Sequence, residues 1–296
     1  MQWGQIKLLF ILSFLVLDIF LFTQFLDKQE ETELSQISTE SENAEEELAS
    51  NDITFADDVL AEEVPNVEGL QSRINDELLE EIDSQVEEVD KDEQSVEVED
   101  NVVRGTFNEP IEVTKDDIQN KVNEHIPFGS QYSFWGWNEE QGVALFFQKA
   151  NDRTVYFNEG GYLLVDVSGG DMNGYVAAML SFGEPEAGEA SQGGDVIGPV
   201  NAVKKLYDAG EISSGDEITA MSIGYHSSFN LEPGEDYGPQ MFAPTWKVTV
   251  NEEDNKFLYA YSGTIIDISE SDFIEGVLSR YDLNESPSEE SDGQGD

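Results

Sequence analysis

The sequence predicts an α+β protein in which a single N-terminal transmembrane helix precedes an extracytoplasmic domain of antiparallel sheets with helices, arranged as two similar halves. Three observations lead to this class. An apolar run lies near the N-terminus, negative charge is concentrated directly after it, and helical patterns then alternate with β-rich runs. The expected regions are a cytoplasmic N-terminus (1–5), a transmembrane helix (6–26), an acidic, mostly extended segment with short helices (27–100), a first α+β half (101–168), a second α+β half (169–283) and a disordered acidic tail (284–296).

The apolar run consists of residues 6–26, IKLLFILSFLVLDIFLFTQFL. At ~1.5 Å per helical residue, it is long enough to cross the ~30 Å hydrocarbon core of a bilayer. It is longer than the ~7–15 apolar residues of a cleaved signal peptide and no small-residue cleavage site follows it, so we interpret it as a retained signal anchor. Lys7 and the α-amino group lie at its start, whereas Lys28 follows within an acidic stretch. This distribution favours a single-pass protein of the cell membrane with a cytoplasmic N-terminus and an extracytoplasmic C-terminal domain.

The charge of the chain is strongly negative and unevenly distributed. The formal net charge is −50, from 64 acidic and 14 basic side chains. Residues 27–100 hold 28 acidic and 3 basic side chains, so their net charge of −25 is half of the total. Because few apolar residues accompany this charge, we expect the segment to be extended and largely solvated. The charge also excludes nucleic acid as a partner, since phosphates are bound by basic surfaces.

Two helical patterns interrupt the acidic segment. Residues 45–55 read as a short helical turn, a stop at Asn51 and Asp52, and a brief strand. Residues 69–89 repeat apolar side chains at three- and four-residue steps, which predicts a helix with one narrow apolar stripe. Such a helix needs a partner surface, which is either the globular domain or another protein.

The globular part carries signs of an internal duplication. Residues 107–110 (FNEP) and 182–185 (FGEP) each end a strand-like run and precede a helix. Later in each half a similar strand appears, at residues 161–168 and 263–269. Two matches in the same order predict two related halves.

The helices of each half have recognisable ends. A capping sequence predicts a first helix within residues 114–127, and a proline in the first turn predicts a second one over residues 199–210. A closing helix, N-capped by Ser269, is expected over residues 270–281. The expected strands are residues 132–137, 143–148, 155–157 and 162–167 in the first half, and 218–225, 245–250, 257–261 and 264–268 in the second.

The residues that most often carry catalysis or bind metals are few and isolated. The chain has no cysteine, and neither His125 nor His226 has a serine-elbow, HExxH or phosphate-loop pattern around it. We expect His125 to stabilise the end of its helix and His226 to lie at the surface. Residues 166–174 lack the spacing and the terminal glutamate of an EF-hand, so we interpret them as a turn. The sequence therefore predicts a protein that is not an enzyme and has no catalytic, metal or cofactor site.

Six side chains are candidates for contacts with partner proteins. Asp18 interrupts the apolar run at a cost of ~2.5–3.5 kcal/mol on insertion scales, and it has no polar neighbour on its own helical face. It either contacts another transmembrane helix or is protonated and hydrogen-bonded within its own helix. Residues 231–242 contain two prolines and two glycines and form either a protruding contact loop or a plain connector. The candidates are Phe14, Asp18 and Phe22 in the run, and Tyr237, Met241 and Phe242 in this segment.

Several segments, taken together, resemble the YycI family, and the similarity follows the order of most of the chain. They are Trp3 and Lys7 at the N-terminus, Phe20-Leu21-Phe22 at the end of the apolar run, ELASNDITF (47–55), GPVNAVKKLYDAGEI (198–212), the turn Ile223-Gly224-Tyr225, PTWKV (244–248) and YAYSG (259–263). YycI and YycH are membrane-anchored accessory proteins of the WalK/WalR (YycG/YycF) two-component system of low-GC Gram-positive bacteria.

The resemblance implies a non-enzymatic regulator. Its outer domain is expected to pair with a YycH-like sister protein, and its anchor to pack against the transmembrane helices of a WalK-like sensor histidine kinase that controls cell-wall metabolism. The alternative is a tethered extracytoplasmic module that binds or inhibits a cell-wall ligand or hydrolase, in which the anchor is only a tether.

Overall fold

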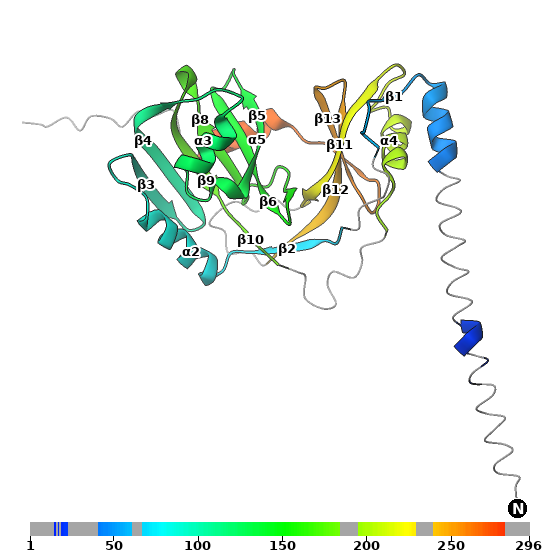
Figure 1. Ribbon diagram of the computed structural model, residues 1–296, viewed down its shortest axis with the longest axis horizontal. Coiled ribbons are helices and arrows are strands. Elements are labelled where there is room, and N and C mark those ends of the chain that lie inside the picture. Colours follow the sequence, from blue (N-terminus) through cyan, green and yellow to red (C-terminus); the bar gives the residue numbers. More distant parts are fainter. Residues whose placement is uncertain are drawn as a thin grey trace, which may run out of the picture.

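The computed structural model is an α+β protein with two mostly antiparallel sheets and helices packed on them, which confirms the predicted class of the domain (Figure 1). The two sheets lie side by side, and the closing helix lies between them and against the first. The predicted N-terminus and acidic tail lie outside the described residues. The structure describes residues 15, 17, 19–22, 41–60, 67–183, 195–228 and 239–281.

Most of the predicted transmembrane helix, residues 6–26, also lies outside the described part of the chain. Its described positions, 15, 17 and 19–22, are helical and exposed. Within the described residues, no helix combines the length and the apolar character that crossing a membrane requires.

The first sheet is a six-stranded antiparallel sheet with a short seventh strand at one side. Its strand order is β3-β4-β9-β8-β6-β5, and the short strand β7 (Arg153–Thr154) pairs with the end of β6. The strands are β3 (Gln94–Glu99), β4 (Val102–Glu112), β5 (Tyr132–Asn138), β6 (Val143–Ala150), β8 (Tyr162–Asp166) and β9 (Asp171–Ala178).

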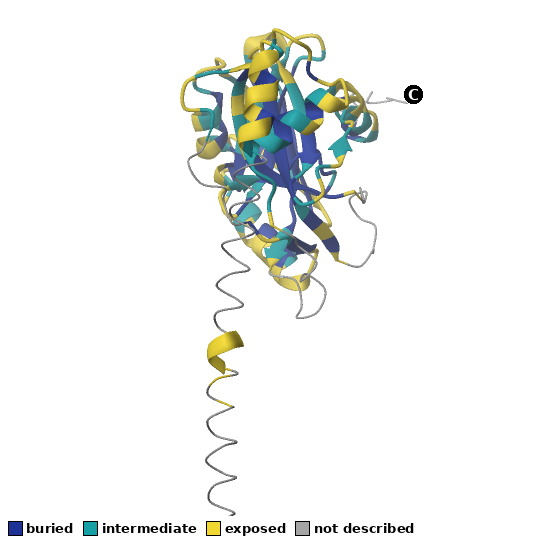
Figure 2. Cartoon of the chain, turned by 90° about the vertical axis from the view of Figure 1, so that its right-hand side faces the viewer, coloured by how far each residue is buried: buried dark blue, intermediate teal, exposed yellow. Residues whose placement is uncertain are grey.

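Both faces of the first sheet are covered, so its central strands are apolar almost throughout. Figure 2 shows the buried residues of the chain gathered in the interior of the domain, with exposed residues on the helices and loops around them. One face packs against α2 (Asp76–Glu87) and α3 (Ile118–His125). The other packs against α5 (Glu270–Tyr281), the last described helix of the chain. The C-terminal helix therefore completes the core of the first sheet.

The second sheet has the order β1-β11-β12-β13-β14. Its first pair, β1 with β11, is parallel, and the later pairs are antiparallel. β2 (Leu70–Arg73) pairs with the start of β12 and with β10 (Ser181–Gly183). On this sheet packs α4 (Pro199–Asp208). The strands of the main order are β1 (Thr54–Phe55), β11 (Glu217–His226), β12 (Gln240–Val250), β13 (Asp254–Tyr259) and β14 (Ile265–Ile266).

Backbone contacts join the two sheets. The amide of Tyr156 donates to the carbonyl of Tyr225 at 2.8 Å. The backbone of residues 154–156 lies so close to β11 that position 224 must be glycine, because a Cβ atom there would lie 2.2 Å from the carbonyl oxygen of Thr154. The Ile223-Gly224-Tyr225 segment therefore lies in β11, within the predicted strand 218–225, and does not form the turn named above.

Aromatic side chains add to this contact between the two sheets, which we call the joint. Trp135 of β5 packs edge-on against Phe157 at 5.2 Å between ring centroids, and its ring also contacts Phe257 of β13. The Nζ atom of Lys247 lies 4.9 Å from the Trp135 ring, and burial lowers the pKa of this lysine. The indole Nε1 donates to Glu270 at the start of α5 at 2.8 Å. Strands of both sheets and the closing helix thus meet at one tryptophan.

The acidic segment is more ordered than we expected. Its described parts, residues 41–60 and 67–100, form a helix, three strands and α2. Our predicted helix over 69–89 starts later, at Asp76, because the side chain of Asn75 caps it by accepting from the amide of Leu78. The apolar side chains of the segment are sparse but well buried, since distant parts of the chain supply the surfaces that cover them.

The strand order repeats along the chain. α3 is followed by the neighbouring strands β5, β6, β8 and β9, and α4 by β11, β12, β13 and β14. The similarity of the two halves themselves stays a prediction. The boundary between the halves differs from our expectation, because residues 171–178 form β9 and pair with β8 and β4 of the first sheet.

Candidate functional site

The described helix at residues 41–50 packs along α4 at the edge of the second sheet (Figure 1). Leu48 of this helix is fully buried, in the same apolar cluster as Val203 and Leu206 of α4. Ala44, one turn earlier, is also buried, while most of the remaining side chains of the helix are exposed. The helix therefore contacts the domain through one narrow face.

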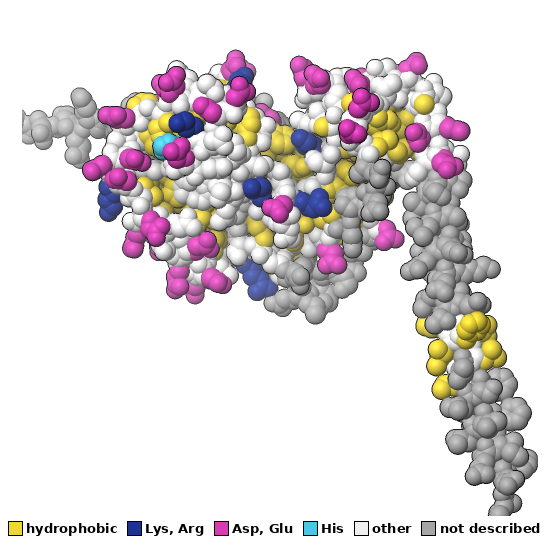
Figure 3. Space-filling model, in the orientation of Figure 1, with side chains coloured by type: hydrophobic (Ala, Val, Ile, Leu, Met, Phe, Trp, Pro, Cys, Tyr) yellow, Lys and Arg dark blue, Asp and Glu magenta, His cyan; other side chains and the backbone are white. Residues whose placement is uncertain are grey.

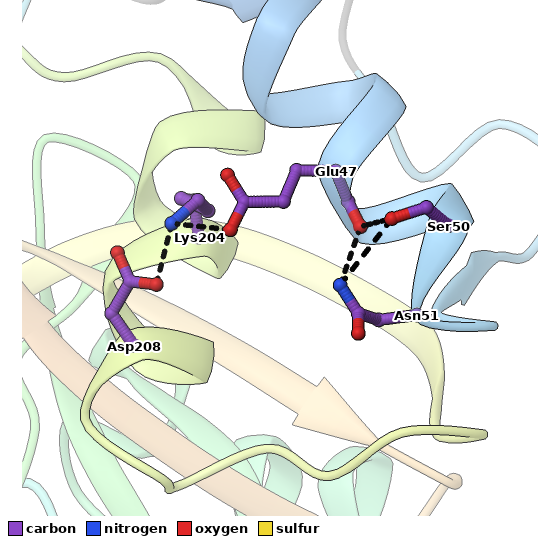
Figure 4. Close-up of polar contacts among 5 residues, drawn as sticks. All are labelled: Glu47, Ser50, Asn51, Lys204 and Asp208. Atoms are coloured by element: carbon purple, nitrogen blue, oxygen red, sulfur yellow. Dashed lines mark hydrogen bonds and ion pairs between the residues drawn. The ribbon is translucent and has the colours of Figure 1, made fainter.

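The sequence after Leu48 ends the helix sharply. Asp52 has a left-handed backbone (φ 60°), its amide bonds the carbonyl of Ala49, and the amide of Ile53 bonds the carbonyl of Leu48. This is the Schellman arrangement, and Ile53 and Leu48 also share the apolar cluster, as that motif favours. The side chains of Ser50 and Asn51 each donate to the carbonyl of Glu47 at 2.8 Å (Figure 4). The chain then enters β1, as the Asn-Asp stop predicted.

An ion pair crosses the contact between the two helices. Nζ of Lys204 on α4 lies 3.2 Å from Oε1 of Glu47 and also binds Asp208, one turn later on its own helix (Figure 4). The hydrogen bonds to Asp208 and then to Glu47 raise the pKa of Lys204 above its ordinary value. The lysine therefore stays protonated between two carboxylates over the physiological pH range.

Polar contacts extend the docking on both sides of this ion pair. Ser214 donates its hydroxyl to the carbonyl of Asn51 at 2.6 Å, and the amide of Thr54 donates to the carbonyl of Asp216 at 3.1 Å. The parallel pairing of β1 with β11 continues this second contact. The helix end and the strand after it are thus held by the chain that follows α4.

Two further segments contact α4 or the residue that precedes it. The stem of Lys205 covers Gly263, where a Cβ atom would lie 2.2 Å from the lysine Cδ, and Gly263 has a left-handed backbone (φ 69°). Trp246 donates its indole Nε1 to the carbonyl of Ile197 just before α4, at 3.0 Å. Residues of β12 and of the 259–263 turn therefore fix the position of the helix.

Four of the segments that carry the family resemblance meet at α4. They are residues 47–55, 198–212, 244–248 and 259–263. Residues 198–212 contain α4, and the contacts described above join each of the other three segments to these residues or to Ile197 just before them. Sequence reasoning identified all four but not their contact, because no spacing or periodicity links segments so far apart. The candidate functional site is this docking surface, which we call the α4 docking site: the helix at residues 41–50, β1 and α4.

The structure separates the six candidate partner contacts. Phe14, Asp18 and Tyr237 lie outside the described residues. Phe22 is 62% exposed and Met241 is 38% exposed. Phe242 is only 1% exposed and packs edge-on against the Phe182 ring, 5.6 Å away.

Phe242 therefore contributes to the core and not to a contact loop. The reason is that the end of the expected loop, residues 240–242, begins β12 and pairs with β2. Alternate side chains of a strand point to opposite faces, so Met241 is exposed where Phe242 is buried.

The two histidines have different environments. His125 lies in the last turn of α3, as expected. His226 is buried at the end of β11, and its Nδ1 lies 3.0 Å from the hydroxyl of Tyr259. The expected surface position of His226 is therefore wrong, because β11 extends to this residue and places its ring against Tyr259 of β13. Burial lowers the pKa of His226 to about 4, so it is neutral at physiological pH.

Comparison with known proteins gives one family and two distant structures. A crystal structure of an uncharacterized protein from Eubacterium rectale has 11% identity and a TM-score of 0.39, covering 69% of this chain and 86% of that one. The C-terminal domain of YpeB from Bacillus megaterium has 8% identity and a TM-score of 0.37, covering 67% and 97%. No curated protein matches the chain. The family model described as YycI protein matches residues 31–261, which is well over half of the sequence. The chain therefore belongs to the YycI family.

Proposed function

We propose that this protein is a non-enzymatic, membrane-anchored regulator of a WalK-like sensor histidine kinase that controls cell-wall metabolism, and that it acts with a YycH-like sister protein. Family membership supports a role in the WalK/YycG regulatory system and a non-catalytic regulatory or binding module. The observation that carries the proposal is the α4 docking site, which attaches the chain between the anchor and the domain firmly to the domain.

The length of the chain limits how far the domain lies from the membrane. The predicted anchor ends at residue 26 and the docked helix begins at residue 41. The intervening peptide units span at most roughly 50 Å when fully extended. Since the docked helix is fixed to α4, a partner that binds the domain restricts the anchor, and a partner that binds the anchor restricts the domain. This two-way restriction is how we propose that the protein influences the kinase.

The first experiment removes the docking and keeps the anchor. Leu48→Asp places a carboxylate in the apolar cluster. Glu47→Lys replaces the attraction to Lys204 by repulsion, at an exposed position where unfolding is not expected. Transcription controlled by the kinase is measured in a host that lacks its own copy of the gene. We expect Leu48→Asp to lose most of the regulation and Glu47→Lys to lose part of it. Glu46→Lys, an exposed change on the same helix, is the control and should keep full regulation. Full regulation by both docking variants would contradict the proposal.

The second experiment separates the regulator from the tethered binding module that is its alternative. Residues 6–26 are replaced by an unrelated apolar helix of the same length. If the anchor contacts the kinase, regulation and co-purification of the kinase from membranes are both lost. If the anchor is only a tether, both survive the replacement, and a binding or inhibitor module for a cell-wall ligand or hydrolase becomes the better explanation.

A further inference from the structure

A cleft of about 570 Å³ lies at one end of the first sheet. Three segments of the chain form it: residues 113–115 after β4, residues 137–142 at the end of β5 and in the turn to β6, and residues 167–170 after β8. The volume is within the range of small-molecule sites in proteins. The cleft shares no residue with the α4 docking site, and the proposed function makes no use of it.

Polar contacts between the three segments give the cleft a defined shape. Nζ of Lys115 in the first segment lies 2.7 Å from Oε1 of Glu139 in the second. The amide of Val167 in the third segment donates to the carbonyl of Gly142 in the second at 2.8 Å. The walls are therefore held together before any ligand arrives, which lowers the entropic cost of binding.

A β-bulge in β5 determines where Trp137 lies. Side chains two positions apart in a regular strand point to the same face, so Trp135 and Trp137 would share one face. The register of β5 with β6 shifts between Phe134 and Gly136. Trp135 consequently packs on the α5 side of the sheet, whereas Trp137 packs on the side that α2 and α3 cover and lines the cleft. Bulges that redirect a side chain are common beside functional sites.

Trp137 also differs from the other described tryptophans in its hydrogen bonding. Trp135 donates its indole N–H to Glu270, and Trp246 donates to the carbonyl of Ile197. Trp137 is half-buried, and its Nε1 is neither enclosed nor hydrogen-bonded among the described residues. Indole N–H groups that leave water usually find a partner. The side chain therefore offers an apolar ring and a free donor to a ligand.

The other groups that line the cleft suit a neutral ligand rich in hydroxyl groups. Lys115 is already paired with Glu139, and the exposed Glu140 is the lining residue whose charge has no ion-pair partner in the structure. The hydroxyl of Ser168 and the side-chain amide of Gln141 both donate and accept hydrogen bonds. A ligand therefore gains more from hydrogen bonds here than from charge.

A pyranose sugar matches this combination of groups. One face of its ring carries C–H groups that pack on an indole, and its edge carries hydroxyl groups that bond hydroxyls, amides and an indole N–H. The ring of Trp137, with the buried side chains of Val113 and Val167, supplies the first kind of contact, and Ser168 and Gln141 supply the second. We infer that this cleft binds a neutral pyranose sugar that stacks on Trp137.

A neutral probe keeps the test free of the general charge of the protein. Figure 3 shows carboxylates over the visible face, with few basic side chains between them, and such a surface attracts any cation. The probes are three neutral disaccharides, N,N′-diacetylchitobiose, cellobiose and maltose, which differ in linkage and acetylation but share the pyranose ring. The full chain is studied in a polyoxyethylene detergent, because detergents with sugar headgroups would compete.

The first readout is the indole N–H signals of the protein in NMR spectra. Each tryptophan gives its own signal, and the signal that Trp137→Leu lacks belongs to Trp137. At least one disaccharide should shift this signal and leave those of Trp135 and Trp246 unchanged, since both of these donors are already bonded within the domain.

The second readout is saturation transfer to the sugar, which gives the affinity of every variant. Trp137→Leu should weaken binding at least tenfold. Ser168→Ala, at an exposed position where unfolding is not expected, should weaken it at least threefold. The matched control is Phe134→Leu, which removes a half-buried aromatic ring from the same strand and the same face but outside the cleft. It should leave the affinity within twofold of the unchanged protein.

Three results would overturn the inference. Absence of any shift of the Trp137 signal with all three sugars would leave the cleft without the inferred ligand. Equal losses of affinity in Trp137→Leu and Phe134→Leu would show that the effect comes from the packing of the sheet. Equal affinity for tetrahydropyran-2-methanol, which keeps the ring but has a single hydroxyl group, would assign the cleft to apolar ligands. None of these outcomes depends on regulation of the kinase, so they are independent of the proposed function.

Discussion

Oε1 of Glu47 lies 3.2 Å from Nζ of Lys204, so an ion pair joins the helix at residues 41–50 to α4. Exposed ion pairs contribute only ~0–1 kcal/mol to stability. Complete burial of a leucine side chain contributes ~1.5–3 kcal/mol, and Leu48 is completely buried in the same contact. The buried leucine therefore contributes more to holding the helix against α4 than the ion pair does.

Leu48→Ala should destabilise the domain. Removing a buried leucine leaves a cavity, and such changes lower the free energy of unfolding by ~2–5 kcal/mol. Denaturant unfolding, followed by tryptophan fluorescence, measures the change. Glu46→Ala, on the exposed face of the same helix, is the control and should stay within ~0.5 kcal/mol of the unchanged protein. Equal unfolding curves for the leucine variant and the unchanged protein would mean that the helix is not docked in solution.

Gly224→Ala should weaken the joint between the two sheets. The added methyl group would lie 2.2 Å from the Thr154 carbonyl oxygen and 2.5 Å from the Tyr156 ring. Overpacking of this kind costs ~1–3 kcal/mol, and more where backbone must move. Gly136→Ala is the matched control, because a Cβ atom there meets nothing within 4 Å. Thermal unfolding should show a lower midpoint for the first variant only.

His226 should make the stability of the domain depend on pH. Its pKa falls from 6.5 to about 4 on folding because the ring is buried. Between these values the unfolded chain binds a proton that the folded protein does not. The free energy of unfolding should therefore decrease as the pH falls from about 6.5 to about 4, by ~2–3 kcal/mol from this group.

The measurement compares the unchanged protein with His226→Gln. Glutamine keeps a hydrogen-bonding group for Tyr259 but does not titrate. Denaturant unfolding at pH 7 and pH 4.5 should show a smaller loss for the variant than for the unchanged protein. The same loss in both would exclude this histidine as the cause and leave the carboxylates to explain it.

Asp18→Leu should weaken association of the anchor with the transmembrane helices of its partners. Polar contacts between helices in a bilayer average only ~0.6 kcal/mol and reach ~1–2, so a few-fold loss is expected. Asp18→Asn keeps a hydrogen-bonding group and should retain most of the association. Membrane cross-linking at matched expression measures both. If the leucine and asparagine variants associate equally well, residues 6–26 act as a tether alone.

Local signals predicted the helices of the domain well. Pro199 starts α4 and the left-handed Gly210 follows it, as proline and glycine do at helix ends. The side chain of Asp117 accepts from the amide of Thr114 at 2.7 Å, which is the reach-back contact that the capping sequence predicted. Such features act within a few residues, so one sequence is enough to read them.

Burial could not be predicted in the same way. Leu48 is buried by Val203 and Leu206, more than 150 positions later, so the apolar content of residues 27–100 alone gave no sign that they fold. His226 and Phe242 were placed in loops because prolines and glycines lie between them, but each belongs to a strand that a distant segment pairs with or covers. The α4 docking site was missed for the same reason.

The position of α5 has a consequence for the order in which the protein matures. Ile274 and Val277 of this last described helix close one face of the first sheet, whose strands are all synthesised much earlier. Until the ribosome has released residue 281, that face, which includes Phe147 and Tyr162, lacks the part of its cover that α5 provides. A chain that stops before α5 should therefore expose these apolar side chains and be degraded or aggregate, although it contains every strand of the described part of both sheets.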